Sequence, residues 1–262
     1  MNEWPLPSQL PDPNALVPEP ADAPPEPYPF WGYADIVVFL GVSFAALLAV
    51  LLVGALLAPL VARAASASPV LVLVLTQAFV YGIGILGLYA VIAVRYRRPL
   101  WDSLRWTGTR SAIRNSALAG VATAIAGSLL AMLVGAQDLD DMPMKAMLAS
   151  RASVAVVGLL AVTLGPIFEE LTFRGFLLPL FAKTLGSPAA IAVCAGAFAL
   201  IHGPQYGWAW QALLPVGFAG ACFGVARVAS GSTGVAAVMH AIYNLTIFSA
   251  FLAQGGADNL PW

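Results

Sequence analysis

Two adjacent carboxylates, Glu169 and Glu170, stand out because they lie inside a long apolar segment of the chain. The other eleven of the thirteen acidic residues occupy the N-terminal tail, the connections, the C-terminal end or the edge of the first apolar span. An ionisable side chain near the centre of a bilayer costs about 2.5–3.5 kcal/mol on insertion scales, so it marks a functional site by default. Carboxylates at that depth are suited to general acid–base chemistry.

Arg174 follows Glu170 by four residues, which brings a guanidinium beside the carboxylate on one helical face. This Glu-to-Arg order is the favourable one, so we expect an ion pair that neutralises Glu170 within its own helix. Neighbouring helical residues point about 100° apart, so Glu169 and Glu170 are expected to need different partners. A purely structural ion pair would explain Glu170 and Arg174 but would not require the second carboxylate, which leaves Glu169 for chemistry.

The chain has only two histidines, His202 and His240, and both lie in apolar segments. A lone histidine in such a segment is usually a satisfied core residue, but finding both at membrane depth favours a role in chemistry. Asn244 follows His240 by four residues, so the two side chains share one helical face. Such a pair can donate hydrogen bonds to a developing oxyanion.

Three short motifs follow one another: residues 169–174 read EELTFR, residues 198–202 read FALIH and residues 240–244 read HAIYN. As EExxxR, FxxxH and HxxxN in this order, they resemble the CAAX-protease and bacteriocin-processing family (CPBP, or Abi) of intramembrane endopeptidases, which includes the Ras-converting endopeptidase. The resemblance covers about residues 153–250, and the earlier segments match the family only as membrane helices. It implies an intramembrane endopeptidase that depends on glutamate and hydrolyses peptide bonds of membrane-associated proteins.

The resemblance also implies a role for each motif residue. Glu169 is expected to be the general base and, with His202, to hold and deprotonate a water for attack on the scissile carbonyl. Glu170, paired with Arg174, is expected to support the site.

The third motif completes the implied site. The resemblance assigns the oxyanion hole to His240 and Asn244, and Phe198 is expected to shape the site beside His202. Some family members are classed as metalloproteases on motif grounds, and two glutamates with two histidines can in principle bind zinc. This chain has no HExxH motif, and the cation of Arg174 would repel a divalent ion. We therefore expect no cofactor, and a metal such as zinc is not favoured.

Two other functions stay open at this stage. The first is a non-catalytic membrane scaffold or bacteriocin-immunity-type protein, although such a module would not need to keep buried charges. The second is a proton-coupled transporter, although the sequence shows no inverted repeat. Other intramembrane proteases fit less well, because Ser232 lies in a Gly-Ser-Thr-Gly turn and no aspartate pair occupies two spans.

The elements that position these residues are expected to be membrane helices. Of the 262 residues, 60% are hydrophobic and only 10% are charged, whereas soluble domains carry about a quarter charged residues. Apolar runs long enough to cross about 30 Å of hydrocarbon lie near 36–62, 70–94, 113–135, 153–182, 188–203, 211–229 and 233–253, the fifth being the shortest. We predict an all-α polytopic transmembrane bundle of about seven helices, multi-pass in the plasma or inner membrane. The expected partner of these helices is membrane lipid. A net charge of -1 gives no basic surface for nucleic acid.

The N-terminal region differs in composition from the rest. Ten prolines with interspersed acids before residue 30 predict a disordered Pro-rich tail over residues 1–32, followed by an integral membrane protease domain over 33–254 with its motif-bearing core at 153–250. Arginines cluster between residues 95 and 114, and the positive-inside rule places this connection, and with it the tail, in the cytoplasm. The expected substrate is a peptide or protein, with or without a membrane anchor. The sequence does not indicate whether it is prenylated.

Overall fold

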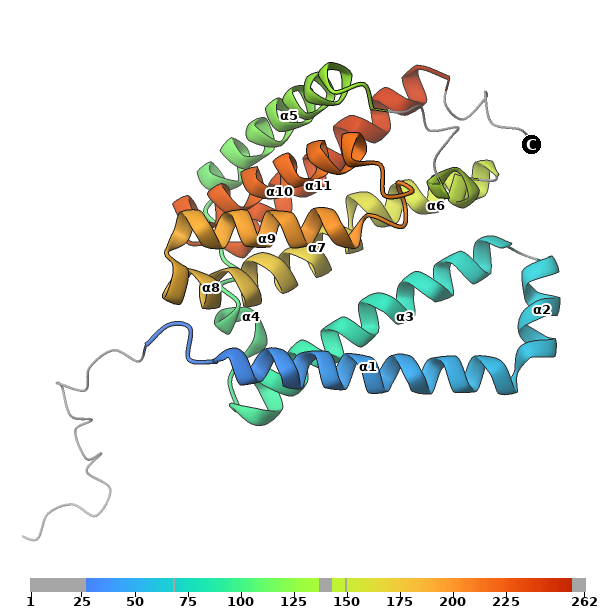
Figure 1. Cartoon of the computed structure of the whole chain (residues 1–262), viewed down its shortest axis with the longest axis horizontal. Coiled ribbons are helices and arrows are strands. Elements are labelled where there is room, and N and C mark those ends of the chain that lie inside the picture. Colours follow the sequence, from blue (N-terminus) through green and yellow to red (C-terminus); the bar gives the residue numbers. More distant parts are fainter. Residues whose placement is uncertain (1–26, 68, 137–142, 149, 256–262) are drawn as a thin grey trace, which may run out of the picture.

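The computed structural model describes residues 27–67, 69–136, 143–148 and 150–255. Within these residues the chain is built from helices without a strand, which confirms the all-α prediction (Figure 1). Six described helices are long and apolar enough to cross a membrane, and Ser187–Ile201 is a shorter apolar helix. The fifth predicted segment is thus the short one, with 15 residues. The multi-pass architecture expected from hydropathy is present.

The first helices form a hairpin. Helix α1 (Tyr33–Leu56) is followed by the short α2 (Ala58–Ala67) and by α3 (Pro69–Tyr89), which continues into the π-helical turn η1 (Ala90–Arg95). Figure 1 shows that α3 leaves α1 at an angle, so the hairpin opens toward α2. The predicted span 36–62 is therefore wrong at its end, because the chain turns after α1 and a new helix begins at Ala58. Pro59 lies in the first turn of this helix, where proline is tolerated.

Most of α1 presents apolar side chains to the outside. Its exposed residues include Val37, Leu40, Phe44, Leu48, Leu51 and Leu52. A helix that is apolar on all sides is typical of a membrane span, where lipid tails take the place of a protein core. The hairpin is thus a lipid-facing element, and the chemistry-bearing residues lie in the helices that follow.

The remaining helices form the motif-bearing bundle. In chain order they are α4 (Leu100–Ser103), α5 (Arg110–Leu133), the 3-10 turn η3 (Pro143–Leu148), α6 (Arg151–Val162), α7 (Leu164–Glu170), the π-helical η4 (Leu171–Leu177), α8 (Leu178–Leu185), α9 (Ser187–Ile201), α10 (Trp210–Ser230) and α11 (Thr233–Ala253). Helix α11 packs against α5, and α10 packs against α9. At Gly120 of α5 an added Cβ would lie 2.5 Å from the carbonyl oxygen of Met239, so this close approach requires glycine.

The predicted span 153–182 is a chain of four helical segments, α6, α7, η4 and α8. The break between α6 and α7 falls at Thr163, with φ -120° and ψ -87°, and the Thr163 hydroxyl donates to the carbonyl of Leu159 at 2.6 Å. The π-helical turn η4 begins directly after Glu170. Because π-helical turns occur mostly as single-turn insertions at functional sites, its place beside the glutamate pair is notable. The break and the π turn together set the direction in which the carboxylates face.

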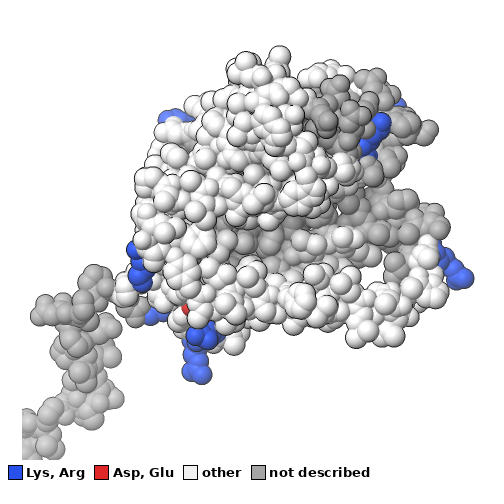
Figure 2. Space-filling model, viewed as in Figure 1, with Lys and Arg blue, Asp and Glu red and all other residues white. Residues whose placement is uncertain are grey.

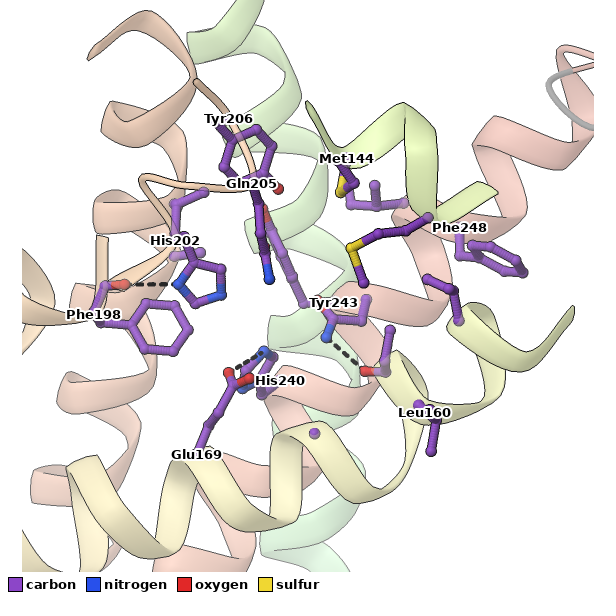
Figure 3. A pocket seen from close by; sticks show the side chains of 18 of the residues that line it. Met144, Leu160, Glu169, Phe198, His202, Gln205, Tyr206, His240, Tyr243 and Phe248 are labelled. Atoms are coloured by element: carbon purple, nitrogen blue, oxygen red, sulfur yellow. Dashed lines mark hydrogen bonds and ion pairs between the residues drawn. The ribbon is translucent and has the colours of Figure 1, made fainter. Parts of the chain in front are cut away.

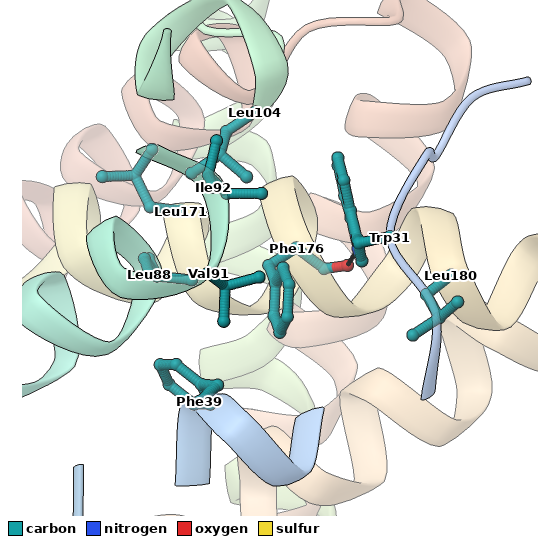
Figure 4. Packing of buried hydrophobic residues seen from close by; sticks show 9 residues of the cluster. All are labelled: Trp31, Phe39, Leu88, Val91, Ile92, Leu104, Leu171, Phe176 and Leu180. Atoms are coloured by element: carbon teal, nitrogen blue, oxygen red, sulfur yellow. Dashed lines mark hydrogen bonds between the residues drawn. The ribbon is translucent and has the colours of Figure 1, made fainter. Parts of the chain in front are cut away.

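Residues just before α1 are packed against the bundle (Figure 4). Trp31 is 1% exposed, stacks on Phe176 of η4 and donates from Nε1 to the Phe176 carbonyl at 3.0 Å. The prediction of a disordered tail as far as residue 32 is therefore wrong for residues 28–31, because the burial of aromatic side chains offsets the entropy cost of ordering the segment. Residues 1–26 of the predicted tail lie outside the described residues.

Candidate active site

A cavity of about 400 Å³ lies among α3, α6, α7, α10, α11 and the loop after α9 (Figure 3). Glu169, His202, His240 and Asn244 all line it. Glu169 lies near the middle of the 35-residue span Arg151–Leu185, so the cavity is at membrane depth. Four of the six predicted site residues therefore face one space, although they come from three separate parts of the chain.

The other two predicted residues are buried beside this cavity. Arg174 donates from Nη1 to Oε1 of Glu170 at 2.8 Å, and both side chains are 0% exposed. Arg174 also donates from Nη2 to the carbonyl of Gly220 at 2.6 Å, and its guanidinium lies 4.8 Å from the ring centre of Phe198. The expected i,i+4 ion pair is confirmed. It also ties η4 to α10, because Gly220 belongs to that helix.

His240 lies between the two glutamates. Its Nδ1 is 3.0 Å from Oε1 of Glu170, and its Nε2 is 3.8 Å from Oε2 of Glu169. The expectation that the two carboxylates need different partners is therefore wrong. A single imidazole serves both, because its ring nitrogens point to opposite sides and α11 brings the ring between them. Since a carboxylate accepts at Nδ1, that nitrogen carries the proton, and Nε2 faces Glu169 and the cavity.

Phe223 holds the His240 ring in place. The two rings are stacked with centres 4.5 Å apart, and the ring of Phe198 meets His240 edge-on at 5.7 Å. These contacts restrict the imidazole to one orientation. The geometry between His240 and the two carboxylates is thus fixed by packing as well as by hydrogen bonds.

His202 follows directly after α9 and reaches the cavity from the other side. Its Nδ1 donates to the carbonyl of Phe198 at 2.7 Å, which leaves Nε2 as an acceptor toward the cavity. The rings of Phe198 and His202 lie 4.6 Å apart, so Phe198 packs beside His202 as expected. His202 and Glu169 face the same space in Figure 3 without a hydrogen bond between them among the described residues. A water between them would meet two acceptors.

Asn244 makes a structural contact that its spacing from His240 does not predict. Its Nδ2 donates to the carbonyl of Ala161 at 2.7 Å. Ala161 lies in the last turn of α6, where the break at Thr163 leaves backbone carbonyls without helical partners. One amide hydrogen of Asn244 is therefore used to fasten α11 to α6, and the second remains for the cavity.

Two residues of the loop after α9 also line the cavity, Gln205 and Tyr206. Figure 3 shows the Gln205 side chain pointing into the space between His202 and Tyr243. The Gln205 carbonyl accepts from the backbone of Met144 at 3.0 Å, which holds the loop against η3. Burial and then the charge of Glu169 raise the pKa of Tyr206, so its hydroxyl stays protonated at neutral pH.

Sequence reasoning does not assign Gln205 or Tyr206 to the site. Both lie within four residues after His202, the last residue of the FxxxH motif. The polar side chains at these positions are the one sequence signal that could have predicted their place in the site. A loop residue shows its direction only when the backbone path is known. Here that path includes a left-handed Trp208, with φ 62°, that folds the loop back onto Gly203.

The donors present do not fit a metal ion. Oε1 of Glu170 already accepts from Arg174 and His240. Among the described residues, no three side chains of His, Cys, Asp or Glu form a group suited to hold a metal. The two cysteines, Cys194 and Cys222, are free thiols.

Comparison with known proteins identifies a family for the segment that carries these residues. Residues 151–246 match the family model described as Rce1-like, type II CAAX prenyl endopeptidase. The matched segment contains all six predicted site residues. No curated protein and no solved structure matches the chain. The resemblance inferred from the three motifs is confirmed, and residues 151–246, which carry the candidate active site, belong to the family of Rce1-like type II CAAX prenyl endopeptidases.

Proposed function

We propose that this protein is an intramembrane endopeptidase that hydrolyses peptide bonds of membrane-associated proteins or peptides. The observation that carries this proposal is the cavity at membrane depth in which Glu169, His202 and His240 meet. A membrane protein keeps ionisable groups at such depth only at a cost, and a shared function in one cavity accounts for that cost. Family membership of the segment adds independent support.

The proposed reaction begins with a water between Glu169 and His202. Glu169 takes a proton from this water while the water oxygen forms a bond to the scissile carbonyl carbon, and Nε2 of His202 accepts the second hydrogen bond. The carbonyl oxygen becomes an oxyanion. Its donors are the second amide hydrogen of Asn244 and, when protonated, Nε2 of His240. The tetrahedral intermediate then breaks at the C–N bond, and Glu169 returns the proton to the leaving amine.

Glu170 and Arg174 have a positioning role in this proposal. Glu170 holds the Nδ1 proton of His240, and Arg174 neutralises Glu170. The tautomer and direction of His240 are therefore set by residues that do not contact the substrate. No metal ion takes part in the proposed reaction.

The rest of the cavity indicates which chemical groups the substrate carries next to the scissile bond. One side is lined by the apolar side chains of Met144, Met147, Leu148, Val157, Phe248 and Phe251. This wall suits an apolar side chain or lipid-modified residue next to the scissile bond, while the polar groups lie together at the other side. A substrate that reaches the cavity from the membrane would present such groups.

The test is cleavage of a quenched fluorescent peptide with an apolar anchor by the purified full-length protein in detergent. Wild-type protein is expected to cleave it, and His202→Phe is expected to lower kcat/KM about 100-fold, because phenylalanine keeps the contact with Phe198 but cannot bind the water. Trp210→Phe is the matched control, since Trp210 is an exposed ring that does not line the cavity. A chelator is expected to leave activity unchanged.

Three outcomes would contradict the proposal. No cleavage of any anchored peptide by folded wild-type protein would remove the peptidase activity. Full activity in His202→Phe would remove its part in holding water. Activity that a chelator abolishes and zinc restores would replace the metal-free mechanism with a metal-dependent one.

Gln205 gives a further prediction about substrate binding. Its amide points into the cavity and makes no side-chain hydrogen bond among the described residues, so it is available to bind the substrate backbone. Gln205→Ala is expected to raise KM about fivefold to tenfold with little change in kcat, the effect of one lost hydrogen bond of about 1 kcal/mol. Gln254→Ala, at the exposed end of α11, is the control. An unchanged KM would show that Gln205 does not contact the substrate.

A further inference from the structure

A second cavity, of about 280 Å³, lies at the end of the bundle where α8 and α10 end. We call it the Arg227 cavity. Its polar groups come from Tyr28, Lys183 and Arg227, and α8 supplies an apolar wall that includes Leu178 and Pro179. This cavity is separate from the candidate active site, because the two share no lining residue.

Arg227 is a buried cation without a charged partner among the described residues. It is 7% exposed, and it donates from Nε to the Thr233 hydroxyl at 3.1 Å and from Nη2 to the Tyr28 hydroxyl at 3.0 Å. Both acceptors are uncharged, and no carboxylate among the described residues forms an ion pair with Arg227. The Nη1 group of Arg227 makes no hydrogen bond with any described residue. A buried charge without a counter-ion is destabilising, so the structure is short of one negative charge at this place.

The neighbouring groups increase this shortage. Lys183 lines the same cavity, and within the described part of the chain its ammonium donates only to the carbonyl of Pro29, at 3.3 Å. The guanidinium of Arg105 lies 4.4 Å from the ring centre of Tyr28. Burial raises the pKa of Tyr28 although Arg227 and Arg105 oppose the shift, so the phenol stays neutral and supplies no negative charge. Two cations, Lys183 and Arg227, therefore line one small cavity, and a third, Arg105, contacts the Tyr28 ring.

The position of the cavity indicates what kind of anion is available. This end of the bundle carries most of the basic residues, and Figure 2 shows blue side chains near the start of α1. The basic residues between η1 and the first turns of α5, and those in the last turns of α8 and α10, are Arg95, Arg97, Arg98, Arg105, Arg110, Arg114, Lys183 and Arg227. The mouth of the cavity lies where α8 and α10 end, which is the depth of lipid headgroups for helices that span the bilayer. Basic pockets between membrane helices at such a surface bind anionic headgroups.

We propose that the Arg227 cavity binds the phosphate group of an anionic phospholipid. The guanidinium of Arg227 and the ammonium of Lys183 neutralise the phosphate, and the acyl chains lie along the apolar outer surface next to the cavity, where Val228 is 43% exposed. Because Tyr28 and Pro29 form one side of the cavity, a bound lipid fastens the segment before α1 to α8 and α10. The site is independent of the proposed proteolysis and is tested without it.

The experiment is native mass spectrometry of the full-length protein released from detergent with equal amounts of phosphatidylglycerol and phosphatidylcholine of identical acyl chains. Wild-type protein is expected to retain phosphatidylglycerol in preference. Arg227→Gln and Lys183→Gln are each expected to reduce this preference about fivefold, the usual effect of one cation near an anionic headgroup. Arg110→Gln, an exposed arginine at the same membrane surface outside the cavity, is the matched control and keeps the preference.

Several outcomes decide the proposal. Lys183 is exposed, so Lys183→Gln remains informative if Arg227→Gln fails to fold. Displacement of the lipid by millimolar inorganic phosphate would support a phosphate site that does not need acyl chains, whereas resistance to phosphate would support the lipid. A wild-type protein without preference, or the same preference in Lys183→Gln, Arg227→Gln and Arg110→Gln, would overturn it.

Discussion

Glu169→Gln is expected to lower kcat/KM for peptide cleavage by at least about 1000-fold while leaving the protein folded. Glutamine has the size of glutamate but cannot take the proton from the attacking water, and general bases contribute about 100- to 10,000-fold. The upper part of this range applies because the same group also returns the proton to the leaving amine. The measurement is reporter cleavage in detergent, with kcat and KM determined separately.

The structure indicates that this substitution affects chemistry alone. The Glu169 side chain is 19% exposed to the cavity, and its one ion-pair contact among the described residues is the 3.8 Å approach to His240. The thermal unfolding midpoint of Glu169→Gln should therefore stay close to that of wild type. Asp102→Asn makes the same change at an exposed acid of α4 and should keep full activity. Activity of Glu169→Gln within tenfold of wild type would assign the base to another group of the cavity, such as His202.

Arg174→Met is expected to lower the free energy of unfolding by about 3–5 kcal/mol, the usual effect of removing one partner of a buried ion pair. Glu170 would be left charged in a site that is 0% exposed, and the Gly220 carbonyl would lose its donor. Methionine fills much of the volume of arginine, so the loss reports the charge and not a cavity. The measurement is denaturant or thermal unfolding of the purified protein in detergent.

A double variant separates charge from packing. Glu170→Gln with Arg174→Met removes both charges, so most of the stability lost in Arg174→Met should return. Activity should stay low in the double variant, because His240 no longer has a carboxylate at Nδ1. Arg110→Met controls for the loss of an exposed arginine. A stability loss in Arg174→Met no larger than in Arg110→Met would show that Glu170 does not depend on the ion pair.

Several features of this protein are encoded locally, and sequence reasoning predicts these well. A run of about twenty successive apolar residues predicts a membrane helix, because each residue must face lipid or another helix. The ion pair of Glu170 and Arg174 is a contact within one helical turn, so its spacing is sufficient to predict it. The contact of Phe198 with His202 is local for the same reason. The three motifs likewise indicated the family.

Other features depend on which helices become neighbours. His240 meets Glu170 across 70 residues of sequence, and no spacing rule shows that one imidazole serves both glutamates. Asn244 reaches the Ala161 carbonyl across 83 residues, at a helix break that hydropathy does not reveal. Catalytic roles for these residues stay predictions until activity is measured.

The sequence by itself therefore determined the membrane helices, the local ion pair and which four motif residues line the cavity. Only the tertiary structure decided how these residues divide their hydrogen bonds, that Gln205 and Tyr206 join them, and that residues 28–31 pack against the bundle. The physical reason is that apolar periodicity acts along the chain, whereas the direction of a polar side chain depends on partners from other helices. The same reason applies to Arg227, whose missing counter-charge becomes visible only when its neighbours are known.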